Sequence, residues 1–139
     1  MKNKIAIFAY ILFLSICVNK INADEIKGKI IDIIVRLPDT YWETTSIFIN
    51  TVNDNTDNAD VIMNINTATY IPAYQNIARS FKTNDEILFD DEGIFFSDVF
   101  NMHEVSFKNV IAKNNISILN YFPEYEFEFP FAAARDKVR

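Results

Sequence analysis

Short stretches rich in isoleucine, valine and phenylalanine, separated by turn-forming residues, dominate the sequence after residue 23, and this pattern limits the fold most. Such β-branched and aromatic stretches favour strands. The predicted strands are residues 26–37, 46–52, 61–65, 86–90, 94–96 and 103–112. Only residues 70–82 show helical spacing, with Tyr74, Ile77 and Phe81 in one apolar stripe. The sequence therefore predicts a mainly β fold with one helix.

The order of these elements narrows the prediction to an OB-fold-like β-barrel. Gly28 and Asp32 interrupt the first strand, which indicates a bend or a bulge. A bent strand, a hairpin, one helix and two further strands follow one another, as in the OB-fold, where the helix lies between the third and fourth strands. The likeness is one of element order over residues 26–112. Another small α+β domain that combines a sheet with a helix is the alternative.

The first 23 residues have the three parts of a secretory signal peptide. Lys2 and Lys4 precede a 14-residue apolar run, and Ala23 supplies a small residue at the predicted cut. A membrane-spanning helix needs about 20 residues. The alternatives are an uncleaved anchor and lipid anchoring at Cys17, although the lipoprotein cleavage box requires a small residue where Ile16 stands. We therefore predict a secreted or periplasmic protein with residues 24–131 as a single OB-like domain and residues 132–139 as a flexible tail.

Charge and cysteine content restrict the partners and the means of stabilisation. The whole chain carries 13 basic and 19 acidic residues, and the predicted signal removes three lysines and no acid, which leaves a net charge of −9. This acidity argues against nucleic acid, whose binding relies on clustered lysine and arginine. Cys17 is the only cysteine. The exported domain would have no disulfide and would depend on its hydrophobic core.

Aromatic residues in two predicted loops are the candidate binding site. Tyr41 and Trp42 follow the first strand, while Phe96 and Phe100 flank the loop between the last two core strands, with His103 nearby. In an OB-fold these two loops border the face that binds oligonucleotides or oligosaccharides. The alternative is that these rings belong to the core, where aromatic residues usually lie.

Catalytic and metal motifs are sparse. Glycine-rich phosphate loops, nucleophile elbows and zinc-binding helices do not occur in the sequence, and no cofactor is predicted. The alternating oxygens of Asn53, Asn55 and Asp57 are a weak calcium candidate, because the glycine and terminal glutamate of a calcium loop are missing. A hairpin turn is the alternative. Asp90 and Asp91 are the carboxylates on which a hydrolase hypothesis depends.

Strict alternation of aromatic residues and glutamates near the C-terminus predicts an edge strand over residues 125–129. Tyr125, Phe127 and Phe129 would share one face of this strand, and an exposed edge can pair with another chain. The alternative is that the strand covers the domain's own core. We therefore hold three hypotheses: a non-enzymatic module that binds a protein or a glycan, an oligomeric subunit of an envelope or secreted complex, and a carboxylate-dependent hydrolase. The oligomer resembles the ring-forming cell-binding subunits of bacterial toxins, although those commonly carry a disulfide.

Overall fold

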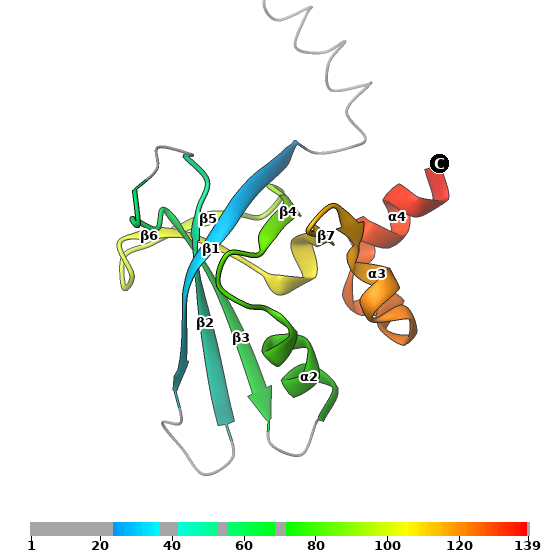
Figure 1. Ribbon diagram of the computed structural model, residues 1–139, viewed down its shortest axis with the longest axis horizontal. Helices are drawn as coiled ribbons and strands as arrows, with labels where there is room; N and C mark the ends of the chain where they lie inside the picture. The colour runs from blue at the N-terminus through cyan, green and yellow to red at the C-terminus, as the bar shows by residue number, and fades with distance from the viewer. Residues whose placement is uncertain (1–23, 37–41, 53–55, 69–71, 139) are drawn as a thin grey trace, which may run out of the picture.

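One mixed sheet of eight strands, in the order β5-β6-β3-β2-β1-β4-β7-β8, organises the protein (Figure 1). The computed structural model describes residues 24–36, 42–52, 56–68 and 72–138. The elements are β1 (Glu25–Arg36), β2 (Trp42–Asn50), β3 (Val61–Ala68), α2 (Pro72–Ser80), β4 (Glu86–Asp90), β5 (Phe95–Ser97), β6 (Met102–Val105), η1 (Phe107–Asn109), β7 (Val110–Lys113), β8 (Ile116–Ser117), α3 (Ile118–Tyr121), η2 (Pro123–Glu128) and α4 (Pro130–Val138). The fold is a mainly β domain with a few short helices, and the described strand pairings leave the sheet open.

The first strand bends as the sequence predicts. β1 pairs with β2 through residues 29–36 and with β4 through residues 25–29, so it belongs to two parts of the sheet. A register shift between Ile30 and Asp32 marks a bulge against β2. A Cβ atom at Gly28 would lie 2.3 Å from the Cγ2 atom of Ile49, so only glycine fits at this close approach of β1 and β2.

The core lies between the inner face of the sheet and the helices. Fully buried side chains from the strands include Ile30, Ile47 and Met63. Helix α2, which confirms the helix predicted from residues 70–82, adds Ile77 to the same cluster. Within each strand or helix the apolar residues are spaced so that one face turns toward the core. Burial of each apolar side chain contributes roughly 1.5–3 kcal/mol to stability.

The strand predicted over residues 103–112 is broken by a short 3-10 helix. β6 ends at Val105, η1 follows, and β7 begins at Val110. The hydroxyl of Ser106 accepts a hydrogen bond from the backbone N–H of Lys108, which caps η1. The buried amide of Asn109 donates to the backbone oxygens of Asp90 and Glu92. Local capping and this buried amide therefore override the strand pattern.

The predicted edge strand over residues 125–129 is wrong, because these residues lie mostly in η2. Phe122, Tyr125 and Phe129 are spaced by three and four residues and pack together, with Phe122 and Phe129 rings stacked at 6.2 Å. Phe129 is fully buried, whereas Phe127 points outward and is 95% exposed. Pro123 suits the first turn of a helix. The inward aromatic residues thus follow a helical spacing, and the alternating pattern misleads.

The C-terminal residues are also helical where the sequence predicts a flexible tail. α4 covers Pro130–Val138, and Ala132 and Ala133 are buried. Figure 1 shows α3 and α4 beside β7, on the side away from β5 and β6. The ring of Phe107 contacts both Tyr74 and Phe129 edge-on, so the C-terminal segment continues the core beyond α2.

Candidate functional site

A hydrogen-bonded row of polar side chains crosses four strands on the outer face of the sheet. The guanidinium of Arg36 on β1 donates to the hydroxyl of Ser46 on β2 at 2.7 Å. That hydroxyl donates to the side-chain oxygen of Asn64 on β3 at 2.6 Å. The amide nitrogen of Asn64 then donates to Glu104 on β6 at 3.1 Å. We call Arg36, Ser46, Asn64 and Glu104 the polar row. Each bond fixes the next side chain, so the groups at the surface are held in place before any ligand arrives.

The register of the strands brings the polar row together. Ser46 lies directly opposite Asn64, and Glu104 lies opposite Ile62, the residue two before Asn64. Side chains at such positions share one face of the sheet. Ile62 is fully buried but lies outside the main core cluster, and Ser46 is only 1% exposed. Ser46 is therefore the buried member of the polar row, and Ile62 is a buried residue beside it. Arg36, Asn64 and Glu104 are more accessible to solvent.

Phe100 joins this site, as a member of the predicted aromatic set. Its ring lies over the Arg36 guanidinium, with 5.6 Å between the guanidinium carbon and the ring centroid. Phe100 belongs to the segment between β5 and β6. A cation stacked on an aromatic face at this distance is attracted by about 0.5–1 kcal/mol. Phe100 thus orients Arg36 and gives the site an aromatic border.

Phe96 and His103 lie together but away from the polar row. They face each other across β5 and β6, and their rings meet edge-on at 5.3 Å. Phe95 pairs with Glu104 at the next position, so the two pairs occupy opposite faces of this hairpin. Phe96 is half exposed, and His103 is exposed as well. The structure therefore divides the predicted aromatic face into two groups.

The remaining predicted site residues fall partly outside the described residues. Tyr41 lies outside them, and Trp42 is described only as the first residue of β2, without its side chain. The calcium candidates Asn53 and Asn55 also lie outside, while Asp57 is exposed. Within the described part of the chain, no three histidine, cysteine or acidic side chains come close enough to hold a metal ion.

The carboxylate of Asp60 closes the hairpin between β2 and β3. It accepts hydrogen bonds from both the backbone N–H and the hydroxyl of Thr51. The backbone N–H of Asp60 also donates to the carbonyl of Ile49 at 3.0 Å. These bonds join the two ends of the connection between the antiparallel strands β2 and β3.

Asp90 of the hydrolase hypothesis is buried at the end of β4, where it is 4% exposed. Burial raises the pKa of its carboxyl above the ordinary value, and the charges of Asp91, Glu92 and Glu25 raise it further. A hydrogen bond from the backbone N–H of Glu92, at 2.8 Å, acts in the opposite direction. The turn that follows is held by the same buried amide of Asn109 described above. Asp90 therefore has a structural role in this turn.

The raised pKa predicts how stability depends on pH. The native state holds the Asp90 proton more tightly than the unfolded state, so the contribution of Asp90 to the free energy of unfolding falls as pH rises above about 4, the unfolded value. Asp90→Asn keeps an acceptor for the Glu92 N–H and removes the buried charge. We expect the variant to be more stable than the wild type at pH 7, with the difference shrinking toward pH 4. Urea unfolding across this range measures it, with Asp98→Asn, at an exposed aspartate after β5, as the control. A difference that grows toward acid pH would contradict the prediction.

Sequence reasoning missed most of the polar row. Ser46 and Asn64 occupy alternate, outward positions in two strands that were predicted to form a hairpin, and this was the available signal. Arg36 sits at the end of the first predicted strand, and Glu104 follows the single histidine. Asn64 and Glu104 come together only because β3 pairs with β6. The sequence pattern does not predict this pairing.

The chain matches no protein-family model, no curated protein and no solved structure. None of the helices in the described residues has the length and hydrophobicity needed to cross a membrane.

Proposed function

We propose that this protein is an exported binding module that recognises a glycan through the outer face of β1, β2, β3 and β6. The single observation that carries the proposal is the polar row with Phe100 at its border. Export is inferred from the signal-like residues 1–23. Different observations support the OB-like strand arrangement and the glycan ligand.

An OB-like strand arrangement is part of the proposal, and the strand pairings support it. Phe89 lies opposite Val110, and Phe95 lies opposite Glu104. The two positions are six places apart in sequence on each side, so β4–β5 and β6–β7 are two halves of one hairpin that keeps its register across η1. One half pairs with β1 in antiparallel fashion, and the other pairs with β3 in parallel. Through this hairpin the strands would surround the core, as in a partly open OB barrel.

The chemistry of the polar row suits sugar hydroxyls. A hydroxyl group both donates and accepts hydrogen bonds, and the row offers guanidinium and amide donors beside carboxylate and amide acceptors. Phe100 adds an aromatic surface against which the apolar face of a sugar ring can pack. In OB-folds the second and third strands with their neighbouring loops bind oligosaccharides. The polar row lies on the corresponding strands.

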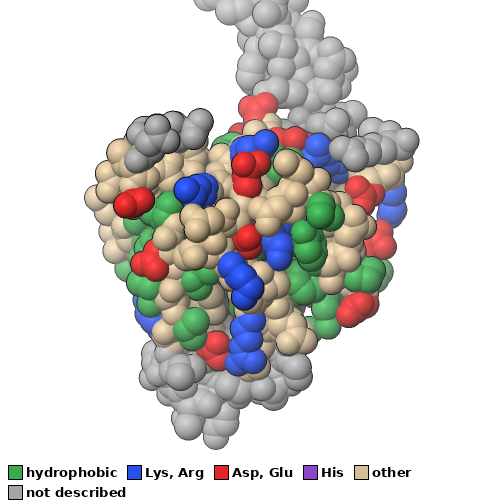
Figure 2. Space-filling view, viewed as in Figure 1, with side chains coloured by type: hydrophobic (Ala, Val, Ile, Leu, Met, Phe, Trp, Pro, Cys, Tyr) green, Lys and Arg blue, Asp and Glu red, His purple; other side chains and the backbone are tan. Residues whose placement is uncertain are grey.

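The charge distribution favours a neutral glycan over a polyanion. Figure 2 shows lysine, arginine and acidic side chains interspersed over the visible face rather than gathered by sign. The row itself has one cationic end, Arg36, and one anionic end, Glu104. A nucleic-acid groove would instead need clustered cations.

The test is binding of residues 24–139 to immobilised oligosaccharides built from hexoses, N-acetylhexosamines and uronic acids. For a saccharide that binds, Arg36→Met and Asn64→Ala are each expected to weaken affinity about tenfold, or about 1.4 kcal/mol, because each removes a positioned donor. Titration calorimetry measures the loss, and thermal unfolding verifies that the variants fold.

Arg79→Met is the matched control, because Arg79 lies on α2 and faces Glu43 at 3.9 Å, outside the polar row. Its affinity should equal that of the wild type. Two results would reject the proposed function: no saccharide of the panel binds, or saccharide binding is unchanged in both polar-row variants. In that case a protein ligand becomes the better explanation of the aromatic segments.

A further inference from the structure

The geometry points to a second sugar subsite in a cavity on the same outer face, so that the ligand is an extended oligosaccharide rather than a single sugar. This inference rests on the proposed function and adds the length of the ligand and the place of its far end. It is carried by a cavity of about 400 Å³ that is separate from the polar row. A volume of this size is within the range of small-molecule sites.

Hydrogen-bond donors and hydrogen-bond acceptors together line the cavity. The polar members include Lys27, Lys29, Asn50, Thr56, Asp57 and Glu86, which come from β1, β2, the start of β4 and the segment after β2. Among the described residues that line the cavity none is aromatic, and the apolar part of the lining includes Ile31. This mixture of hydrogen-bond donors and acceptors suits a polyhydroxylated ligand.

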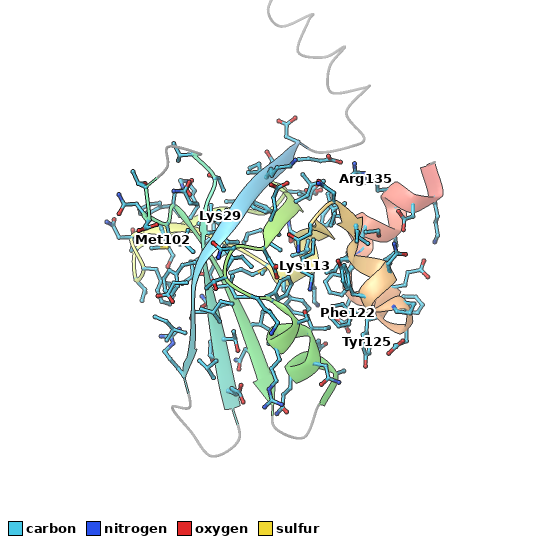
Figure 3. The ribbon with its side chains drawn as sticks, viewed as in Figure 1. Lys29, Met102, Lys113, Phe122, Tyr125 and Arg135 are labelled. Atoms are coloured by element: carbon cyan, nitrogen blue, oxygen red, sulfur yellow. The ribbon has the colours of Figure 1, made fainter. Side chains whose placement is uncertain are left out.

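One wall of the cavity is held by hydrogen bonds of Asn50, and Lys29 supplies a cation that can bind a ligand. The amide of Asn50 donates to the carbonyl of Thr56 at 3.1 Å and accepts from the backbone N–H of Val52 at 3.0 Å. Lys27 is paired with Glu86 at 3.1 Å. Lys29, which is labelled on β1 in Figure 3, is exposed and has no carboxylate within ion-pair distance among the described residues. Lys29 can therefore donate to a ligand without first breaking an ion pair.

Opposite charges balance around the cavity, which decides between ligand classes. Lys27 and Lys29 line the cavity together with the carboxylates of Asp57 and Glu86. A phosphate or sulfate would gain from the lysines but would be repelled by these carboxylates. A neutral sugar accepts from the lysines and donates to the carboxylates, so it uses both kinds of group.

One strand connects the cavity to the polar row. Ser46, Phe48 and Asn50 alternate along β2, so their side chains share one face of the sheet. Ser46 belongs to the polar row and Asn50 lines the cavity, and four residues of strand separate them by about 13 Å. Phe48 lies between the two sites and is half-buried, opposite the exposed Asp32. A sugar unit packed on Phe48 would link units at the two ends.

The experiment is titration calorimetry of residues 24–139 with glucose, mannose and N-acetylglucosamine oligosaccharides, from disaccharide to hexasaccharide. In the wild type, the hexasaccharide of the bound sugar should bind at least about tenfold more tightly than the disaccharide. Lys29→Gln should remove this advantage and leave disaccharide affinity unchanged. Arg36→Met should weaken both lengths by the same factor.

Lys82→Gln is the matched control, because Lys82 is another exposed lysine and lies beyond α2, away from the cavity lining. It should retain the length dependence. Failure of every oligosaccharide to bind would reject the proposed function itself. Binding whose affinity does not depend on length, or whose length dependence survives Lys29→Gln, would overturn only the second subsite.

Discussion

Phe129→Ala is expected to lower the free energy of unfolding by about 3–5 kcal/mol, the usual cost of truncating a buried phenylalanine. Phe129 is fully buried, stacks on Phe122 and meets Phe107 edge-on. The alanine variant would leave a cavity where the C-terminal segment joins the main core. Chemical denaturation measured by far-ultraviolet circular dichroism gives the difference between variant and wild type.

Phe127→Ala is a matched control two residues away, because the Phe127 side chain is 95% exposed. Its free energy of unfolding should stay within about 0.5 kcal/mol of the wild type. The contrast between the two variants tests the helical arrangement of this segment. In an edge strand the two rings would share one face, so similar losses for both variants would argue for a strand.

Gly28→Ala is expected to destabilise the protein by about 2–3 kcal/mol, because the added methyl has no room. Its carbon would lie 2.3 Å from the Cγ2 atom of Ile49 and 3.1 Å from the Cγ2 atom of Thr51. Relief of this contact requires β1 and β2 to move apart beside a buried core residue. Urea unfolding measures the cost.

The cause can be isolated with Ile49→Ala, which removes the methyl group that Gly28→Ala would meet. In the Ile49→Ala background, the alanine at position 28 should cost clearly less than in the wild type. This is a double-mutant cycle between two residues in contact. Equal costs in both backgrounds would show that the clash with Ile49 is not the reason for glycine at this position.

Local patterns in the sequence were enough to predict most of the strands and the helix. The breaks at Gly28 and Asp32 correctly indicated an irregular first strand, and the apolar stripe through Tyr74 and Ile77 correctly indicated α2. Both signals are local, since a strand or helix face repeats over a few residues. The strand prediction for residues 125–129 was wrong because two patterns overlap there. The alternation fits a strand, whereas the spacing of Phe122 and Phe129 fits the helical structure that forms.

The candidate site was harder to predict, because it depends on contacts between distant segments. Asn64 and Glu104 are 40 residues apart and meet only through the parallel pairing of β3 with β6. The sequence correctly predicted a loop at Phe100. It did not indicate that the ring contacts Arg36, which lies at the end of a strand. Register between non-adjacent strands is set by the whole fold, so a reading of one segment at a time does not reveal it.

The buried cation of Lys113 illustrates the same difficulty. Its ammonium group donates to the carbonyl of Ser80 at the end of α2 and lies 4.3 Å from the ring centroid of Tyr121. Figure 3 shows Lys113 between the sheet and the C-terminal helices. In the sequence this lysine directly follows the strand predicted over residues 103–112. Its contacts with Ser80 and Tyr121 give it a structural role, as a positive charge at the C-terminal end of α2.

The most direct test of the binding face is a map of amide chemical-shift changes in residues 24–139 during titration with an oligosaccharide. The shifts are expected to cluster around Arg36, Asn64 and Glu104, with further changes near Lys29 when the oligosaccharide is long. This result would place the ligand on the outer face of β1, β2, β3 and β6. A cluster confined to α2, α3 and α4, or no shift at saturating saccharide, would contradict it.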